Sequence, residues 1–171
     1  MTLAEHNQAC YDLLDEYMQL KYVSKEAEDE YLLVFQDLNN QRKAALGRTV
    51  ISTIMLPTDT AAFHHLPNKL TIYRGYHEKR KRVGVSWSLS RIVAEDFAHI
   101  TMIKSARDIR PSVATGTCLL KDVLAYTNDR NEQEIIVNPE KVKNIHNIIA
   151  RKSTMHRGAE PLEWLLTHKQ H

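Results

Sequence analysis

The sequence predicts an α+β fold, with a helical amino-terminal region over residues 1–66 and a β-rich core over residues 67–171 in a single domain. Two observations carry this prediction. Apolar side chains recur at the three- and four-residue spacing of amphipathic helices in the first part of the chain. From Leu70 onward, short runs rich in β-branched and aromatic residues take over. A length of 171 residues is ample for one hydrophobic core.

The first helix is expected to run to about Leu20. Thr2 and Glu5 have the spacing of a capping box, in which each residue satisfies a backbone N–H of the other. The helical spacing of the apolar residues that follow predicts one buried face, formed by Cys10, Leu13, Leu14 and Tyr17.

A second helix is expected to follow Ser24, which is a good N-cap, and to end at Gly47. The two helices would form a hairpin. Shorter helical segments are predicted over residues 49–55 and 59–65, the latter ended by Pro67.

In the second part of the chain, the β-type runs are interrupted by a helix over residues 90–100, which has a serine N-cap and apolar residues at helical spacing. A short closing helix is expected from Pro161. The predicted strands cover residues 70–75, 83–88, 114–120, 134–137 and 142–149.

Composition is ordinary for a globular protein, with 43% apolar and 26% charged residues, and a formal charge of +2 is too small to predict nucleic-acid binding by itself. The two cysteines, Cys10 and Cys118, and the nine histidines lack metal-ligand spacing, so we expect neither a disulfide framework nor a metal site. The start of the chain does not resemble a signal peptide, and no apolar run approaches the ~20 residues of a membrane helix. We therefore expect a soluble, cytoplasmic protein that does not engage a membrane.

An arginine interrupts the first apolar strand. Leu70, Ile72 and Arg74 share one face, because side chains alternate along a strand. A half-buried guanidinium needs an anionic partner, and its planar fork suits a carboxylate or a phosphate. Gly75 beside it lets a backbone or a ligand approach closely. For an isolated Tyr-Arg-Gly, the plain alternative is a salt bridge to an acid elsewhere in the fold.

The next strand carries two serines on one face, Ser86 and Ser88, with Trp87 pointing the other way. A small, hydroxyl-bearing face can hold a planar ligand and hydrogen-bond it. Solvent-facing serines are the plain alternative.

Two carboxylates precede the apolar run Ile135–Val137. If that run is a buried strand, Glu132 and Glu134 lie on one face at its start, about 7 Å apart. Like charges at this distance raise each other's pKa, so the pair costs stability unless a ligand or a reaction uses it. A solvated strand end, with an ion pair to Arg130, is again the plain alternative.

Taken in order, these three features resemble the mono-ADP-ribosyltransferases of the arginine-serine-glutamate, cholera-toxin-like clade. The familiar middle motif is Ser-Thr-Ser, so Trp87 departs from it at a position that points away from the serine face. The resemblance covers roughly residues 70–150 and is carried by Tyr73-Arg74-Gly75, by Ser86-Trp87-Ser88-Leu89 with Ala94, Phe97 and Ala98 after it, and by Glu132-Gln133-Glu134.

The resemblance implies two small, mainly antiparallel sheets that form a cleft for NAD, which would be cleaved between nicotinamide and ribose. Glu134 would stabilise the positive charge on the ribose, Arg74 would hold a phosphate, and Ser86 would orient Glu134. Ser88 would line the nicotinamide pocket. The remaining residues expected to contact NAD are Gly75, Trp87 and Phe97.

The resemblance also bears on the acceptor. Glutamate at position 132 goes with arginine acceptors in the family, and the preceding loop, with Tyr126 and Arg130, would recognise the target protein. Small transferases of this kind resemble those that bacteriophages use on host proteins. Two alternatives stay open: a transferase acting on nucleic acid, suggested by the basic segment 77–82, and a catalytically silent NAD-binding protein.

Overall fold

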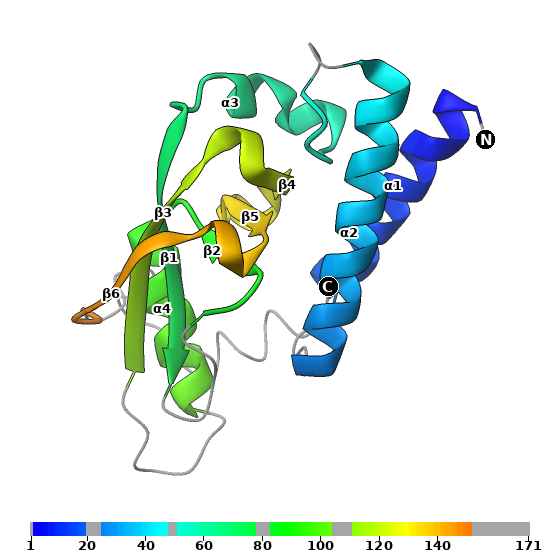
Figure 1. The fold of residues 1–171 in the computed structure, drawn as a ribbon. Helices are drawn as coiled ribbons and strands as arrows, with labels where there is room; N and C mark the ends of the chain where they lie inside the picture. Colours follow the sequence, from blue (N-terminus) through cyan, green and yellow to red (C-terminus); the bar gives the residue numbers. More distant parts are fainter. Residues whose placement is uncertain (1, 20–24, 48–50, 78–82, 104–110, 152–171) are drawn as a thin grey trace.

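The computed structural model describes residues 2–19, 25–47, 51–77, 83–103 and 111–151 (Figure 1). The helices are α1 (Leu3–Gln19), α2 (Lys25–Leu46), α3 (Thr60–His64) and α4 (Arg91–Ile103). The strands are β1 (Lys69–His77), β2 (Ser86–Ser88), β3 (Pro111–Leu119), β4 (Val123–Thr127), β5 (Glu134–Val137) and β6 (Lys143–Ile148). Short 3-10 turns lie at η1 (Pro57–Asp59), η2 (Leu120–Asp122), η3 (Asp129–Asn131) and η4 (Pro139–Lys141).

The strands form one six-stranded sheet with the order β4-β5-β2-β1-β3-β6, and every neighbouring pair is antiparallel. The predicted α+β class is thus confirmed, whereas the expected two separate sheets are not found. The reason is β2, which pairs with β5 on one side and meets β1 through Tyr73 and Ser88 on the other. This single pairing joins the halves β4-β5-β2 and β1-β3-β6 into one sheet.

The predicted helical hairpin is present. Thr2 and Glu5 form the expected capping box: the Glu5 carboxylate accepts from the Thr2 N–H at 2.6 Å, and the Thr2 hydroxyl accepts from the Glu5 N–H at 3.2 Å. Gly47 follows α2 with a φ of +80°, a left-handed conformation that favours glycine. The helical segment predicted over residues 59–65 corresponds to the end of η1 and to α3.

The predicted helix over residues 49–55 is wrong where the structure describes it. Ile54 instead forms a parallel bridge to Ala125, with its N–H donating to the Leu124 carbonyl at 2.8 Å. The extended form depends on this neighbour, β4, which the sequence reasoning also missed. The closing helix predicted from Pro161 lies outside the described residues.

The helical hairpin packs on one face of the β4-β5-β2 half of the sheet (Figure 1). The apolar residues of the hairpin and of the core form one buried cluster. It comprises Cys10, Leu13, Leu14, Tyr17 and Phe35 from the helices and Ile54, Val85, Ala125 and Ile136 from the core. Helix α4 packs against β1 and β3. A second buried cluster joins side chains of several strands with Phe63 of α3; it includes Leu70, Ile72, Trp87 and Ile135. Within the described ranges, no helix has the length and apolarity that crossing a bilayer requires.

Candidate active site

Arg74 lies at the junction between the two halves of the sheet. Its Nη1 donates to the Ser86 carbonyl at 2.7 Å, which ties the guanidinium of β1 to the start of β2. Its Nη2 pairs with the Glu28 carboxylate from α2 at 3.3 Å. The side chains of Arg74 and Glu28 are only 14% and 11% exposed. The anionic partner that a half-buried arginine needs is therefore supplied here by the amino-terminal hairpin.

Gly84 provides the surface on which the guanidinium rests. A Cβ atom at this position would lie 2.5 Å from Arg74 Cζ, so only glycine leaves room for the arginine in its observed place. The Trp87 indole donates to the Gly84 carbonyl at 2.8 Å and is itself buried in the core. The Trp87 indole thus fixes the backbone at Gly84, and at 1% exposure its side chain offers almost no surface for the predicted contact with a cofactor.

Ser86 and Glu134 form the second part of the site. The Ser86 hydroxyl donates a hydrogen bond to Glu134 Oε1, which is the bond that the family resemblance implies. Antiparallel pairing of β2 with β5 allows this contact. It places Glu134 directly opposite Ser88, and therefore diagonally opposite Ser86 on the same face of the sheet. The serine thereby touches both the arginine, through its carbonyl, and the carboxylate, through its hydroxyl.

Glu132 was predicted to share a strand face with Glu134, but β5 begins at Glu134, so Glu132 lies before the strand. It lies instead in a tight loop whose flanking residues, Asn131 and Gln133, have φ values of 58° and 46°. Non-glycine residues in this left-handed region cost free energy, and they cluster at functional sites. The Ser88 hydroxyl donates to the Glu132 carbonyl at 2.7 Å and so helps to fix the loop.

Ser88 itself is buried and also accepts a hydrogen bond from the Ser90 N–H at 2.9 Å. Its hydroxyl is thus engaged by the backbone on both sides. Ser88 thus holds the glutamate loop in place, and its role in lining a nicotinamide pocket stays a prediction.

Tyr17, from α1, lies close to Ser86 and Glu134. Its ring is buried and stacks edge-on against Tyr31 and Phe35 at centroid distances of 5.3 and 5.6 Å. Burial, followed by the negative charges of Glu134 and Glu28, raises the pKa of the Tyr17 phenol above its ordinary range. The phenol of Tyr17 is therefore protonated at neutral pH.

Gly75 lets the backbone of α4 approach closely, which is one of the two possibilities that the sequence left open. A Cβ atom there would lie 2.0 Å from the Ala94 carbonyl oxygen and 2.6 Å from the Ala98 nitrogen, so the backbone of α4 occupies the space beside Gly75. Phe97, on the same helix, is 41% exposed, and α4 meets the sheet through its alanines.

The two residues predicted to recognise an acceptor have different outcomes. Tyr126 is 2% exposed and its ring packs 5.5 Å from that of Phe63, so it belongs to the hydrophobic core and not to a recognition surface. The backbone of Arg130 lies in η3, and its side chain is outside the described residues. Most of the basic segment, residues 78–82, is outside them as well.

Sequence reasoning missed three contributors to the site: Glu28, Tyr17 and Gly84. Tyr17 fell on the predicted apolar stripe of the first helix, where it was counted as a core residue. Glu28 lies beside the apolar residues of the second helix. The spacing of apolar residues in a helix does not predict which strand a neighbouring polar side chain will contact. Gly84 preceded the serine motif, but its closeness to Arg74 arises only when the two strands pair.

Among the residues that the structure describes, no group of three or more histidine, cysteine, aspartate or glutamate side chains could hold a metal ion. Comparison with protein-family models, with curated proteins and with solved structures gives no match for this chain. The assignment of a function therefore depends on the residues and the geometry of the site.

Proposed function

We propose that the protein is an NAD-dependent mono-ADP-ribosyltransferase that transfers ADP-ribose to an arginine of a protein acceptor and releases nicotinamide. The observation that carries the proposal is the position of Ser86, whose carbonyl accepts from Arg74 while its hydroxyl donates to Glu134. One serine thus brings a phosphate-binding cation and a fixed carboxylate to the same place. This is the chemistry that cleavage of a dinucleotide at its nicotinamide ribose requires.

The carboxylate acts on the bond that breaks. Cleavage of the N-glycosidic bond leaves its electron pair on nicotinamide and builds positive charge on the ribose, as in glycoside hydrolysis. A carboxylate whose position is set in advance stabilises that charge without reorganisation. The Ser86 hydroxyl holds the Glu134 carboxylate in one orientation, so Glu134 is the residue assigned to this step.

Glu132 is assigned to the acceptor. An arginine guanidinium is a poor nucleophile because it is protonated at ordinary pH. A carboxylate close to the ribose can bind the guanidinium and take up its proton as the new C–N bond forms. The strained loop around Glu132, fixed through Ser88, supports a role that depends on the direction of this side chain.

The test is transfer of label from NAD radiolabelled in its adenylate phosphate to proteins of a bacterial lysate. The wild type should label protein, and mass spectrometry should locate ADP-ribose on arginine. Glu134→Ala should abolish labelling, whereas Glu140→Ala, which changes an exposed glutamate in η4, should leave it unchanged. Equal labelling by the wild type and Glu134→Ala would refute the proposal, and a label removed by nuclease would redirect it to nucleic acid.

A further inference from the structure

The amino-terminal hairpin reaches into the candidate site through two side chains, one from each helix. Glu28 of α2 forms the ion pair with Arg74, and both side chains are almost fully removed from solvent. Tyr17 of α1 lies near the same groups, since its pKa responds to Glu134, Glu28, Arg74 and Ser86. Each helix of the hairpin therefore contributes one side chain beside the candidate site.

The Glu28 carboxylate and a phosphate are alternative partners for the same guanidinium. Both are anions that bind the planar N–H fork of an arginine. The arginine has little room to serve both, because its Nη1 donates to the Ser86 carbonyl and its face lies on Gly84. A diphosphate placed beside Glu28 and Glu134 would also meet two negative charges in a region of low dielectric, where repulsion is strong.

The hairpin has a second polar attachment at a distance from the site. Near the other end of α2, the buried Asn39 side chain donates to the Ser52 carbonyl at 2.8 Å and its Oδ1 accepts from the Ser52 hydroxyl at 3.3 Å. This attachment would survive a movement of the first turns of α2. Loss of the Glu28 contact therefore does not require the whole hairpin to leave the core.

We infer that Glu28 is an intramolecular competitor of the dinucleotide phosphate for Arg74, so that NAD binds only when the first turns of α2 move away from the site. The inference rests on the proposed function and adds to it a residue that sets the affinity for NAD. A protein whose competent form is a minor population binds its ligand more weakly in proportion to that population. Weakening the Glu28–Arg74 pair should therefore tighten the binding of NAD.

Calorimetric titration of NAD into Glu28→Gln tests the inference. This substitution keeps the size of the side chain and removes its charge, and the dissociation constant should fall about tenfold if the competent form is roughly one molecule in ten. Glu30→Gln, which changes an exposed glutamate on the same helix, is the matched control and should bind NAD as the wild type does. Thermal denaturation of each variant verifies that it is folded.

A second measurement uses the wild type alone, so it does not depend on the stability of a variant. Hydrogen exchange of amides in residues 25–35 should become faster when NAD is added. Equal or weaker binding of NAD by Glu28→Gln, or slower exchange of these amides with NAD, would overturn the inference and leave the proposed function standing. Absence of NAD binding by both the wild type and Glu28→Gln would instead refute the proposed function, and the inference with it.

Discussion

Gly84 and the Ser86 carbonyl together determine where the charge of Arg74 lies. The carbonyl accepts from Nη1 at 2.7 Å, and the absence of a side chain at position 84 lets the guanidinium lie against the backbone. Neither feature carries charge or reacts, yet both set the position of the cation that is proposed to bind phosphate. At this scale the site depends on backbone groups as much as on its polar side chains.

Gly84→Ala should impair NAD binding with little loss of stability. The added methyl group would meet the far end of a flexible side chain, with Arg74 Nη2 at 2.5 Å, so Arg74 can turn aside and leave the core undisturbed. The displaced guanidinium can no longer bind the phosphate in place, which should weaken NAD binding by about tenfold or more. Calorimetry and urea denaturation measure the two effects. A variant that binds NAD normally would contradict the proposed role of Arg74.

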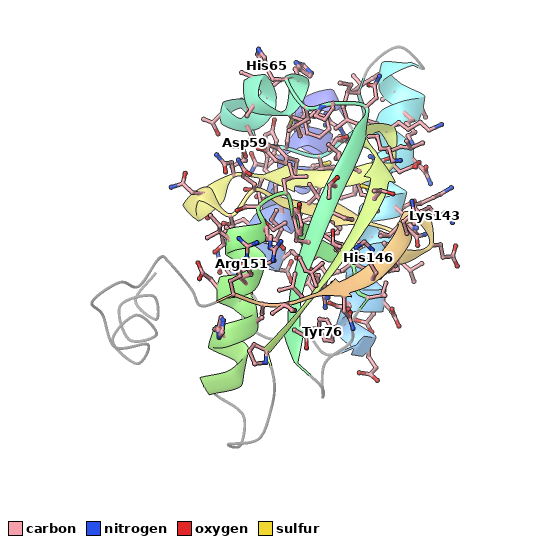
Figure 2. All side chains as sticks on the ribbon, turned by 90° about the vertical axis from the view of Figure 1, so that its left-hand side faces the viewer. Asp59, His65, Tyr76, Lys143, His146 and Arg151 are labelled. Atoms are coloured by element: carbon pink, nitrogen blue, oxygen red, sulfur yellow. The ribbon has the colours of Figure 1, made fainter. Side chains whose placement is uncertain are left out.

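Asp59, which Figure 2 labels, is a second residue whose environment can be tested, and it lies near Asn128 and Asp129 at the turn η3. Burial raises its pKa above the ordinary value of 3.8, against the effect of the Asn128 backbone N–H, which donates to the carboxylate. The folded state therefore binds this proton more tightly than the unfolded chain does. The resulting loss of stability develops as the pH rises above about 4 and persists at pH 7.

Asp59→Asn should consequently raise the melting temperature at pH 7, because the amide oxygen can still accept from Asn128 and no charge is desolvated. The difference from the wild type should shrink as the pH falls toward 4, where the wild-type carboxyl becomes protonated. Thermal denaturation at several pH values measures this. A variant less stable than the wild type at pH 7, or a difference that does not change with pH, would contradict the assignment.

At the scale of elements, the contact between β1 and α4 positions the strand that carries Arg74. The helix approaches so closely because residue 75 is glycine and the facing residues are Ala94 and Ala98. At its outer side, α4 is joined to the segment after β6, where the Arg151 N–H donates to Glu95 at 3.3 Å (Figure 2). The helix thus packs on the face of β1 at Gly75, whereas Arg74, the preceding residue, points to the other face and meets Glu28 of the hairpin.

Gly75→Ala should strongly destabilise the fold, because its Cβ would collide with helix backbone and not with a side chain that can turn away. We expect the free energy of unfolding to fall by about 3 kcal/mol, at the upper end of the usual cost of overpacking. Gly47→Ala is the control. It meets no atom within 4 Å and should cost only about 1 kcal/mol, from its positive φ. A Gly75→Ala variant as stable as Gly47→Ala in urea would contradict the close packing.

The helix ends that the sequence predicted well are fixed by neighbours in the chain. The capping box of Thr2 and Glu5 and the end of α2 at Gly47 are local events, so their residue types were sufficient. The extended segment around Ile54 and the strand β4 form only when they meet each other. The weak helical preference of residues 49–55 was overridden there by backbone pairing with the distant strand β4.

At the scale of the whole molecule, the hairpin and the sheet make the site together. Arg74, Ser86 and Glu134 could be named from the sequence because they recur in the order of a known motif. Glu28 and Tyr17 could not, since their place follows from how the buried stripe of the hairpin docks on the β4-β5-β2 half of the sheet. The sheet supplies the proposed chemistry, and the hairpin is inferred to decide when NAD can reach it.

The central claim, that Glu134 in its setting of Arg74 and Ser86 cleaves NAD, is tested most directly by nicotinamide release. The purified protein is incubated with NAD and a small guanidine compound as acceptor, and free nicotinamide is quantified by chromatography. We predict that the wild type releases nicotinamide and that Glu134→Gln does so about a hundredfold more slowly, as is typical when one preorganised electrostatic group is lost. Release at the wild-type rate by Glu134→Gln, or no release by the wild type, would contradict the account.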